Sequence, residues 1–81
     1  MMNLYKFEIG VNGFLLKVHF CATEQSGVNY TKAYIYKFQK EVANLELEVN
    51  IYKREVQKQR QYNRKPYLFT KKMNEKAILS K

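Results

Sequence analysis

The stretch YKFEIGVNGFLLKVHF (residues 5–20) decides the fold expected for the first part of the chain. Its centre, Asn12-Gly13, tolerates the positive φ angles that both central positions of a type I′ turn require, and apolar residues alternate on either side. The pattern therefore predicts an antiparallel hairpin over residues 3–22 with one apolar face. The expected pairs on that face are Val11–Phe14, Ile9–Leu16, Phe7–Val18 and Tyr5–Phe20, and the other face brings Glu8 opposite Lys17.

The segment that follows the hairpin has the composition of a long helix. Residues 30–65 contain no Gly or Pro, and apolar residues recur in them at alternating spacings of three and four. This heptad pattern predicts one helix over about residues 29–63, capped by Ser26 or Asn29, that covers the hairpin and pairs with a second copy of the chain. The predicted oligomer interface consists of Ile35, Phe38, Val42, Leu45, Val49, Tyr52 and Val56.

A competing pattern lies inside this segment. The sequence LELEVNI (residues 45–51) alternates with a period of two, as a half-buried strand does. A third strand at 45–52 would then follow a shorter helix, which Asn44 would end because Asn tolerates the left-handed conformation. The expected fold class is therefore α+β, in which the N-terminal antiparallel hairpin packs on one long helix with an extended basic C-terminal tail. The alternative is a ββαβ arrangement.

Pro66 marks the end of any helix, because proline lacks a backbone N–H and keeps the preceding residue out of helical geometry. We therefore expect residues 1–70 to form a single small domain and residues 71–81 (KKMNEKAILSK) to form a flexible basic tail.

The positive charge of the chain is concentrated in its second part. The net charge is +8, and residues 1–29 sum to zero, so the whole excess lies in residues 30–81. Residues 53–72 alone hold eight Lys or Arg and one Glu. The dipole of a helix end favours a few cations there, whereas a segment this basic, with Gln, Asn and Tyr between the cations, is typical of nucleic-acid contact. The expected phosphate-binding and base-stacking residues are Lys53, Arg54, Lys58, Arg60, Tyr62, Arg64, Lys65, Tyr67, Lys71 and Lys72. Phe69 is a further candidate for base stacking.

The sequence contains no signature of catalysis. His19 and Cys21 lie two residues apart without a third group to complete a nucleophilic or metal site, and the chain has no Asp and no glycine-rich phosphate loop. We therefore expect no enzyme activity, no metal, no cofactor and no small-molecule substrate. With one Cys, no signal peptide and no apolar run long enough to cross a bilayer, a cytoplasmic protein without membrane contact is expected.

Two functions are compatible with these patterns. The first is a small non-enzymatic basic protein that binds nucleic acid or a nucleoprotein complex through its C-terminal half. The alternative is a dimeric protein–protein inhibitor or adaptor, for example a viral or mobile-element protein that blocks a host defence or nucleic-acid-processing machine. In that case the basic face would bind an acidic protein target.

Overall fold

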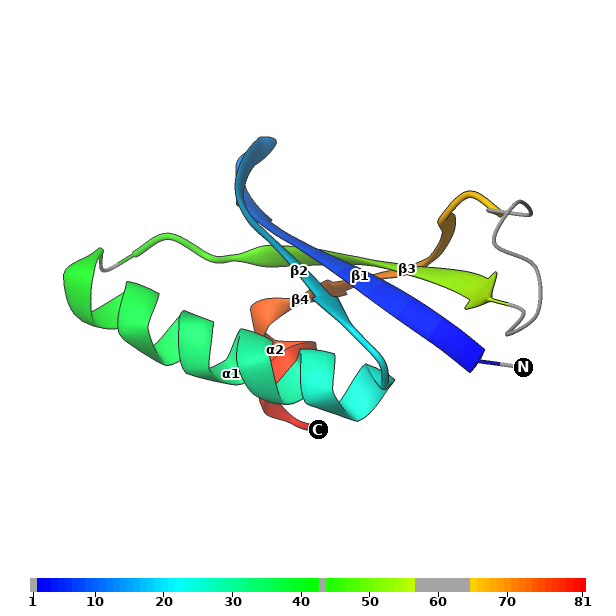
Figure 1. Cartoon of the computed structure of the whole chain (residues 1–81). Coiled ribbons are helices and arrows are strands. Elements are labelled where there is room, and N and C mark those ends of the chain that lie inside the picture. Colours follow the sequence, from blue (N-terminus) through cyan, green and yellow to red (C-terminus); the bar gives the residue numbers. More distant parts are fainter. Residues whose placement is uncertain (1, 43, 57–64) are drawn as a thin grey trace.

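The computed structural model describes residues 2–42, 44–56 and 65–81, and it has an α+β architecture (Figure 1). Its elements are β1 (Met2–Val11), β2 (Phe14–Cys21), α1 (Glu24–Glu41), β3 (Glu48–Val56), β4 (Leu68–Asn74) and α2 (Glu75–Leu79). The strands form one antiparallel sheet in the order β2-β1-β3-β4. Both helices lie on the same face of this sheet, and no described helix or strand covers the other face, which is called the open face here (Figure 1). Neither described helix is long and apolar enough to cross a membrane.

The N-terminal hairpin is confirmed, but its register differs from the expected one. Asn12 and Gly13 have φ angles of 50° and 82°, as a type I′ turn requires. Beyond the first two pairs, β2 contains one extra residue, Leu16, so that Ile9 pairs with Lys17. Gly10 permits this bulge, because a Cβ there would lie 2.6 Å from the carbonyl oxygen of Phe14.

The bulge exchanges the two faces of β2, because a shift of one residue turns every following side chain to the opposite side. Glu8 therefore lies opposite Val18, and the expected Glu8–Lys17 pair does not form. Lys17 instead lies on the side of the sheet that faces the helices, and Phe20 lies on the open side.

The expected long helix is wrong, and the alternative with a strand after a shorter helix is correct in outline. Helix α1 begins after Thr23, whose hydroxyl accepts a hydrogen bond of 3.1 Å from the backbone N–H of Ser26, so neither Ser26 nor Asn29 is the cap. It ends at Glu41, and Asn44 takes the left-handed conformation with a φ of 76°.

Strand β3 forms where the period-two pattern lies, because this pattern buries Leu47, Val49 and Ile51 together on one side. The heptad residues consequently do not form a single helical stripe. Ile35 and Phe38 lie on α1, Val42 is its C-cap, Leu45 lies in the connection, and Val49, Tyr52 and Val56 lie on β3.

The core lies between the sheet and the two helices. Its fully buried apolar members are Phe7, Ile9, Val28, Ile35, Leu47, Val49, Ile51 and Ile78. The buried hydroxyl of Thr31 donates a hydrogen bond of 2.8 Å to the carbonyl oxygen of Gly27, so its burial leaves no unpaired polar group. Because Ile35 and Val49 are in this core, they are not available for the predicted coiled-coil contact.

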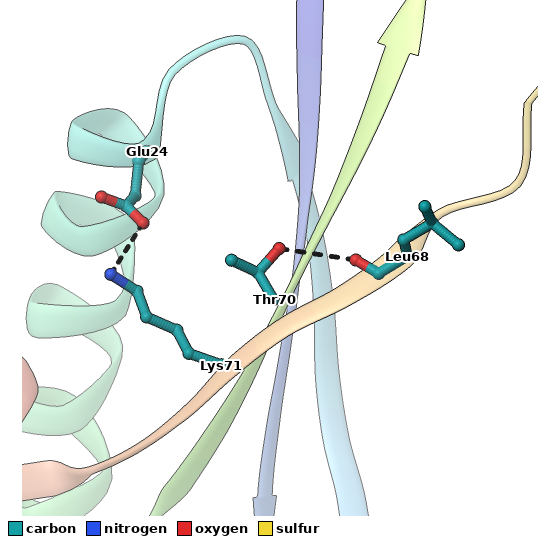
Figure 2. A network of polar contacts seen from close by, with 4 residues as sticks. All are labelled: Glu24, Leu68, Thr70 and Lys71. Carbon is teal, nitrogen blue, oxygen red and sulfur yellow. Dashed lines mark hydrogen bonds and ion pairs between the residues drawn. The ribbon is translucent and has the colours of Figure 1, made fainter.

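The expected flexible tail from residue 71 is also wrong. Lys71 to Asn74 complete β4, and the side chain of Asn74 caps α2 by accepting a hydrogen bond of 2.8 Å from the N–H of Ala77. Ile78 of α2 is fully buried, and this apolar side chain holds the end of the chain on α1. Figure 2 shows Lys71 reaching from β4 to Glu24 in the first turn of α1, with 3.0 Å between Nζ and Oε1.

Candidate functional site

The open face of the sheet carries a continuous row of aromatic and basic side chains. Odd-numbered residues of β1 and β3, such as Phe7 and Ile51, point into the core, so even-numbered residues of these strands point to the open side. The cross-strand pairs then place four residues in line across β2, β1, β3 and β4. These residues, called the aromatic row here, are Phe20, Lys6, Tyr52 and Phe69.

Each end of the aromatic row depends on a bulge in an edge strand. The extra residue Leu16 turns Phe20 outward, as described above. In β4, Thr70 has no partner on β3, which lets Phe69 pair with Tyr52 on the open side while Lys71 faces the helices. The hydroxyl of Thr70 donates a hydrogen bond to the carbonyl oxygen of Leu68 at this bulge (Figure 2).

Tyr67 lies over the aromatic row. Its ring centroid is 5.7 Å from that of Phe20, although Tyr67 precedes β4 and Phe20 lies on the opposite edge strand. Within the row itself, the rings of Tyr52 and Phe69 meet edge to face, with centroids 5.6 Å apart and an interplanar angle of 75°. Such contacts between rings contribute about 0.5–1.5 kcal/mol each beyond the area that they bury.

Two cations lie between these rings. The Nζ atom of Lys6 is 4.4 Å from the ring centroid of Tyr52 and 5.4 Å from that of Tyr67. The guanidinium carbon of Arg54 is 5.0 Å from the ring centroid of Tyr67. These distances fall within the range of cation–π attraction, which fixes both the cations and the rings. The result is a prearranged surface of alternating positive charge and aromatic rings.

The two phenylalanines at the ends of the row remain accessible. Phe20 is 59% exposed and Phe69 is 58% exposed. A large apolar ring that stays this exposed on a sheet face does not contribute its full burial energy to folding. More than half of the surface of each of these residues is therefore available to a ligand.

The acidic residues of the open face lie toward the hairpin turn. Glu8 contacts Lys6 at 3.6 Å, and Glu48 contacts Lys72 at 3.1 Å. A hydrogen bond with Glu8 raises the pKa of Tyr52 above its ordinary value, and burial and the charge of Glu8 act in the same direction. The carboxylates of the open face thus lie on one side of the aromatic row, where each is paired with a lysine, and Arg54 lies on the other side.

The residues predicted to bind nucleic acid are divided between several places. Arg54, Tyr67 and Lys72 lie on the open face, whereas Lys53 and Lys71 lie on the helix side. A hydrogen bond with Glu24 raises the pKa of Lys71, and Lys65 lies 3.6 Å from Glu55. Lys58, Arg60, Tyr62 and Arg64 lie outside the described residues, so their role stays a prediction.

Sequence reasoning missed Lys6, Phe20 and Tyr52 as binding residues, and it named Phe69 as a base-stacking residue without placing it on the same surface as these three. Phe20 was assigned to the apolar face because the bulge at Leu16 was not anticipated, and Tyr52 was assigned to the heptad. The isolated Gly10 within a strand pattern was the available signal for the first error, since such a glycine often marks a bulge.

His19 and Cys21 serve packing on the helix side. The ring of His19 stacks on that of Tyr30 with centroids 3.7 Å apart and an interplanar angle of 2°. Burial raises the pKa of the Cys21 thiol, although hydrogen bonds with Ser26 and Gly27 act in the opposite direction. In the part of the chain that the structure describes, no three His, Cys, Asp or Glu side chains gather into a metal-binding group.

No family model matches this chain, and no curated protein or solved structure matches it at a significant level. The function is therefore inferred from the residues of the open face themselves.

Proposed function

We propose that the open face of the sheet binds single-stranded nucleic acid. The observation that carries this proposal is the aromatic row with two accessible phenylalanine rings and cations between them. Proteins that bind single strands combine aromatic side chains, on which bases stack, with positive charge that follows the phosphates. Four-stranded sheets with aromatic residues on the open face are a known platform for this kind of recognition in RNA-binding domains.

The spacing of the row suits a short run of bases. Phe20 and Phe69 lie on the two edge strands, which are separated by three strand intervals, or about 14 Å at about 4.8 Å for each interval. This span has room for the two or three bases that such sheets typically stack. Phe20 and Phe69 would each stack on a base, and Arg54 would contact phosphate beside them.

The distribution of charge supports the same proposal. Arg54 and Lys72 are on the open face, and the whole charge excess of the chain lies in residues 30–81. In sequence, Lys58, Arg60 and Arg64 follow β3, and their contact with phosphate is part of the proposal. Duplex DNA or RNA does not expose the faces of its bases, so the exposed rings favour a single strand over a duplex.

A purely structural function for the aromatic row is the main competing explanation. Tyr67 and the cations would then simply cover the open face and stabilise the sheet. That explanation accounts for Lys6 and Tyr52, which are half-buried, but not for the exposure of Phe20 and Phe69. The two explanations differ in whether these phenylalanines contribute to binding.

The proposal is tested by fluorescence anisotropy of labelled oligo-dT, oligo-U and duplex DNA titrated with the protein at low salt. We expect saturable binding of the single strands. Replacing the two exposed rings in Phe20→Leu/Phe69→Leu is expected to weaken binding at least about tenfold, because stacking contributes roughly 1–3 kcal/mol per base.

Phe14→Leu is the matched control. Phe14 is 74% exposed, but it lies at the hairpin turn and away from the aromatic row. Its replacement is expected to leave the affinity unchanged. Equal effects of Phe14→Leu and Phe20→Leu/Phe69→Leu, or no binding of any oligonucleotide at low salt, would contradict the proposal.

A further inference from the structure

A groove runs between β2 and α1 on the helix side of the sheet, opposite to the open face. It has a volume of about 510 Å³. The side chains of Tyr30, Tyr34 and Phe38 from α1 form its apolar wall, and Lys17 lines it from β2. Lys17 has this position because the bulge at Leu16 turns it to the helix side.

The strand beside this groove has an unpaired edge. Strand β2 is the first strand of the sheet and, among the described residues, pairs only with β1. Edge strands of this kind are usually protected by proline, by charged side chains, by a bulge or by a covering segment, because their free N–H and C=O groups attract another strand. The sequence of β2, FLLKVHFC, contains one charged residue and no proline. The bulge at Leu16 and the inward-pointing Lys17 protect the end of β2 near the turn, whereas residues 18–21 keep a regular register and are the part that is open to pairing.

We infer that the groove between β2 and α1 binds an extended, acidic peptide segment of a partner protein by strand addition to β2. In this mode, the peptide backbone pairs with the free edge, while alternate side chains enter the neighbouring groove. Apolar side chains of the peptide would contact Tyr34 and Phe38. The groove supplies both requirements of the mode, namely an unpaired strand and an apolar wall next to it.

The charges of the groove specify acidic side chains in the peptide. Lys17 and Lys37 line it from opposite sides, and Glu41 is the acidic residue among its lining residues. A second copy of this chain is a poor occupant, because antiparallel pairing of β2 with itself centred near Lys17 would bring the two Lys17 side chains together. The net charge of +8 on each copy adds to this repulsion.

This inference does not depend on the proposed function. The aromatic row and the groove lie on opposite faces of the sheet, so nucleic acid and peptide would bind without excluding each other. A failure to bind oligonucleotides would therefore not contradict the peptide site, and a failure to bind peptides would not contradict the nucleic-acid site.

The test uses fluorescent peptides of about seven residues, a usual strand length. One peptide carries Val and Glu in turn at every second position, with Thr at the positions between, so that both Val and Glu can face the groove. A second peptide has Lys in place of Glu. Two further versions of the Glu peptide carry N-methyl groups on alternate amides, one version for each edge of the peptide strand. Binding is followed by anisotropy, and ¹⁵N-labelled protein locates the site by NMR.

We expect the Glu peptide to bind saturably with a Kd below about 1 mM and the Lys peptide at least about tenfold more weakly. One N-methylated version is expected to lose at least about tenfold in affinity, because methylation removes the donors that face β2, while the other version binds normally. The perturbed amides are expected to lie on β2 and α1.

Two variants of exposed lysines provide the matched comparison. Lys37→Glu is expected to weaken the Glu peptide about tenfold and to improve binding of the Lys peptide, whereas Lys40→Glu, on α1 but outside the groove, changes neither. The inference is overturned if none of the peptides binds, if both N-methylated versions bind equally, or if the perturbed amides lie on the open face. Self-association of the protein through β2 would overturn it as well.

Discussion

At the scale of single residues, close packing at Gly27 holds α1 against the sheet. A Cβ added to Gly27 would overlap the ring of Phe7, which is fully buried. Because the core surrounds this ring, the ring cannot move aside without loss of packing. The approach of α1 to β1 therefore depends on the absence of a side chain at this position.

Gly27→Ala is expected to destabilise the protein by about 1–2 kcal/mol, because overpacking outweighs the gain of roughly 1 kcal/mol in helix propensity. Urea denaturation measures the change, and Gln39→Ala, an exposed substitution on the same helix, is the neutral control. The loss of stability caused by Gly27→Ala should be smaller when Phe7 is also replaced by leucine, since leucine lacks the ring atoms that the new Cβ would overlap. Strict additivity of the two substitutions would show that the overlap is not the cause.

Another consequence at this scale concerns Tyr52. Because hydrogen bonding with Glu8 raises the pKa of Tyr52 in the folded protein, this tyrosine favours the folded state at neutral pH. The contribution of Tyr52 to the free energy of unfolding is lost as the pH rises through this raised pKa. Glu8→Ala is expected to lower the pKa of Tyr52, as followed by NMR titration with labelled tyrosine. Glu48→Ala, which removes another carboxylate of the same face, should leave the pKa of Tyr52 unchanged.

At the scale of elements, the two edge strands share one device. Each contains a single extra residue, Leu16 in β2 and Thr70 in β4, and each bulge turns a phenylalanine to the open face. Bulges of this kind occur at sheet edges, where they redirect a side chain. The aromatic row therefore depends on strand register as much as on residue type.

Deletion of Leu16 is expected to preserve the fold, because the remaining residues of β2 keep their partners on β1. Deletion of Glu8 from β1, which pairs with β3 without an extra residue, instead turns either Phe7 or Ile9 out of the core. We expect this deletion in the core to lower the free energy of unfolding by more than about 2 kcal/mol, whereas the deletion of Leu16 should lower it by less than about 1 kcal/mol. The midpoints of urea denaturation compare the two variants, and similar losses would show that the bulge does not set the register.

The hairpin and the α+β class could be predicted from the sequence, because Asn-Gly and the alternation around it are local signals. The bulge at Leu16 has one local signal, the isolated Gly10, but the packing of His19 on Tyr30 that accompanies the shifted register is a tertiary contact, which no local pattern predicts. The heptad was misleading because its apolar residues are shared between a helix and a strand that both face the same core. Of the candidate site, Arg54, Tyr67 and Lys72 were anticipated from charge and residue type, whereas the row itself required the strand order.

At the scale of the whole molecule, the sheet separates two surfaces of different chemistry. The open face presents rings and cations, and the helix side presents the groove beside β2. Positive charge dominates the molecule as a whole. In the proposed function, this charge attracts a polyanion at a distance and the local arrangement of rings then selects the ligand. Salt dependence and ring substitutions separate these two contributions.

The salt dependence of oligo-dT binding tests the electrostatic contribution. If Lys6, Arg54 and Lys72 each neutralise a phosphate, log K should fall against log salt with a slope of about −2 or steeper, given about −0.7 for each phosphate of a single strand. Replacing these three cations by Gln should flatten the slope by about 2. Lys40→Gln/Lys53→Gln, which removes cations of the helix side, should leave it unchanged.

The most direct measurement is an NMR titration of ¹⁵N-labelled protein with unlabelled oligo-dT, because it locates the ligand on the molecule. The open-face proposal predicts that the largest shift changes fall on Phe20, Lys6, Tyr52 and Phe69, with Tyr67 beside them. Residues of the groove, such as Tyr34 and Phe38, should be unaffected. Two results would contradict the assignment of the open face as a nucleic-acid-binding surface. One is that shift changes are confined to the groove residues of α1 and to Lys17 of β2, and the other is that no shift changes at all at a high oligonucleotide concentration.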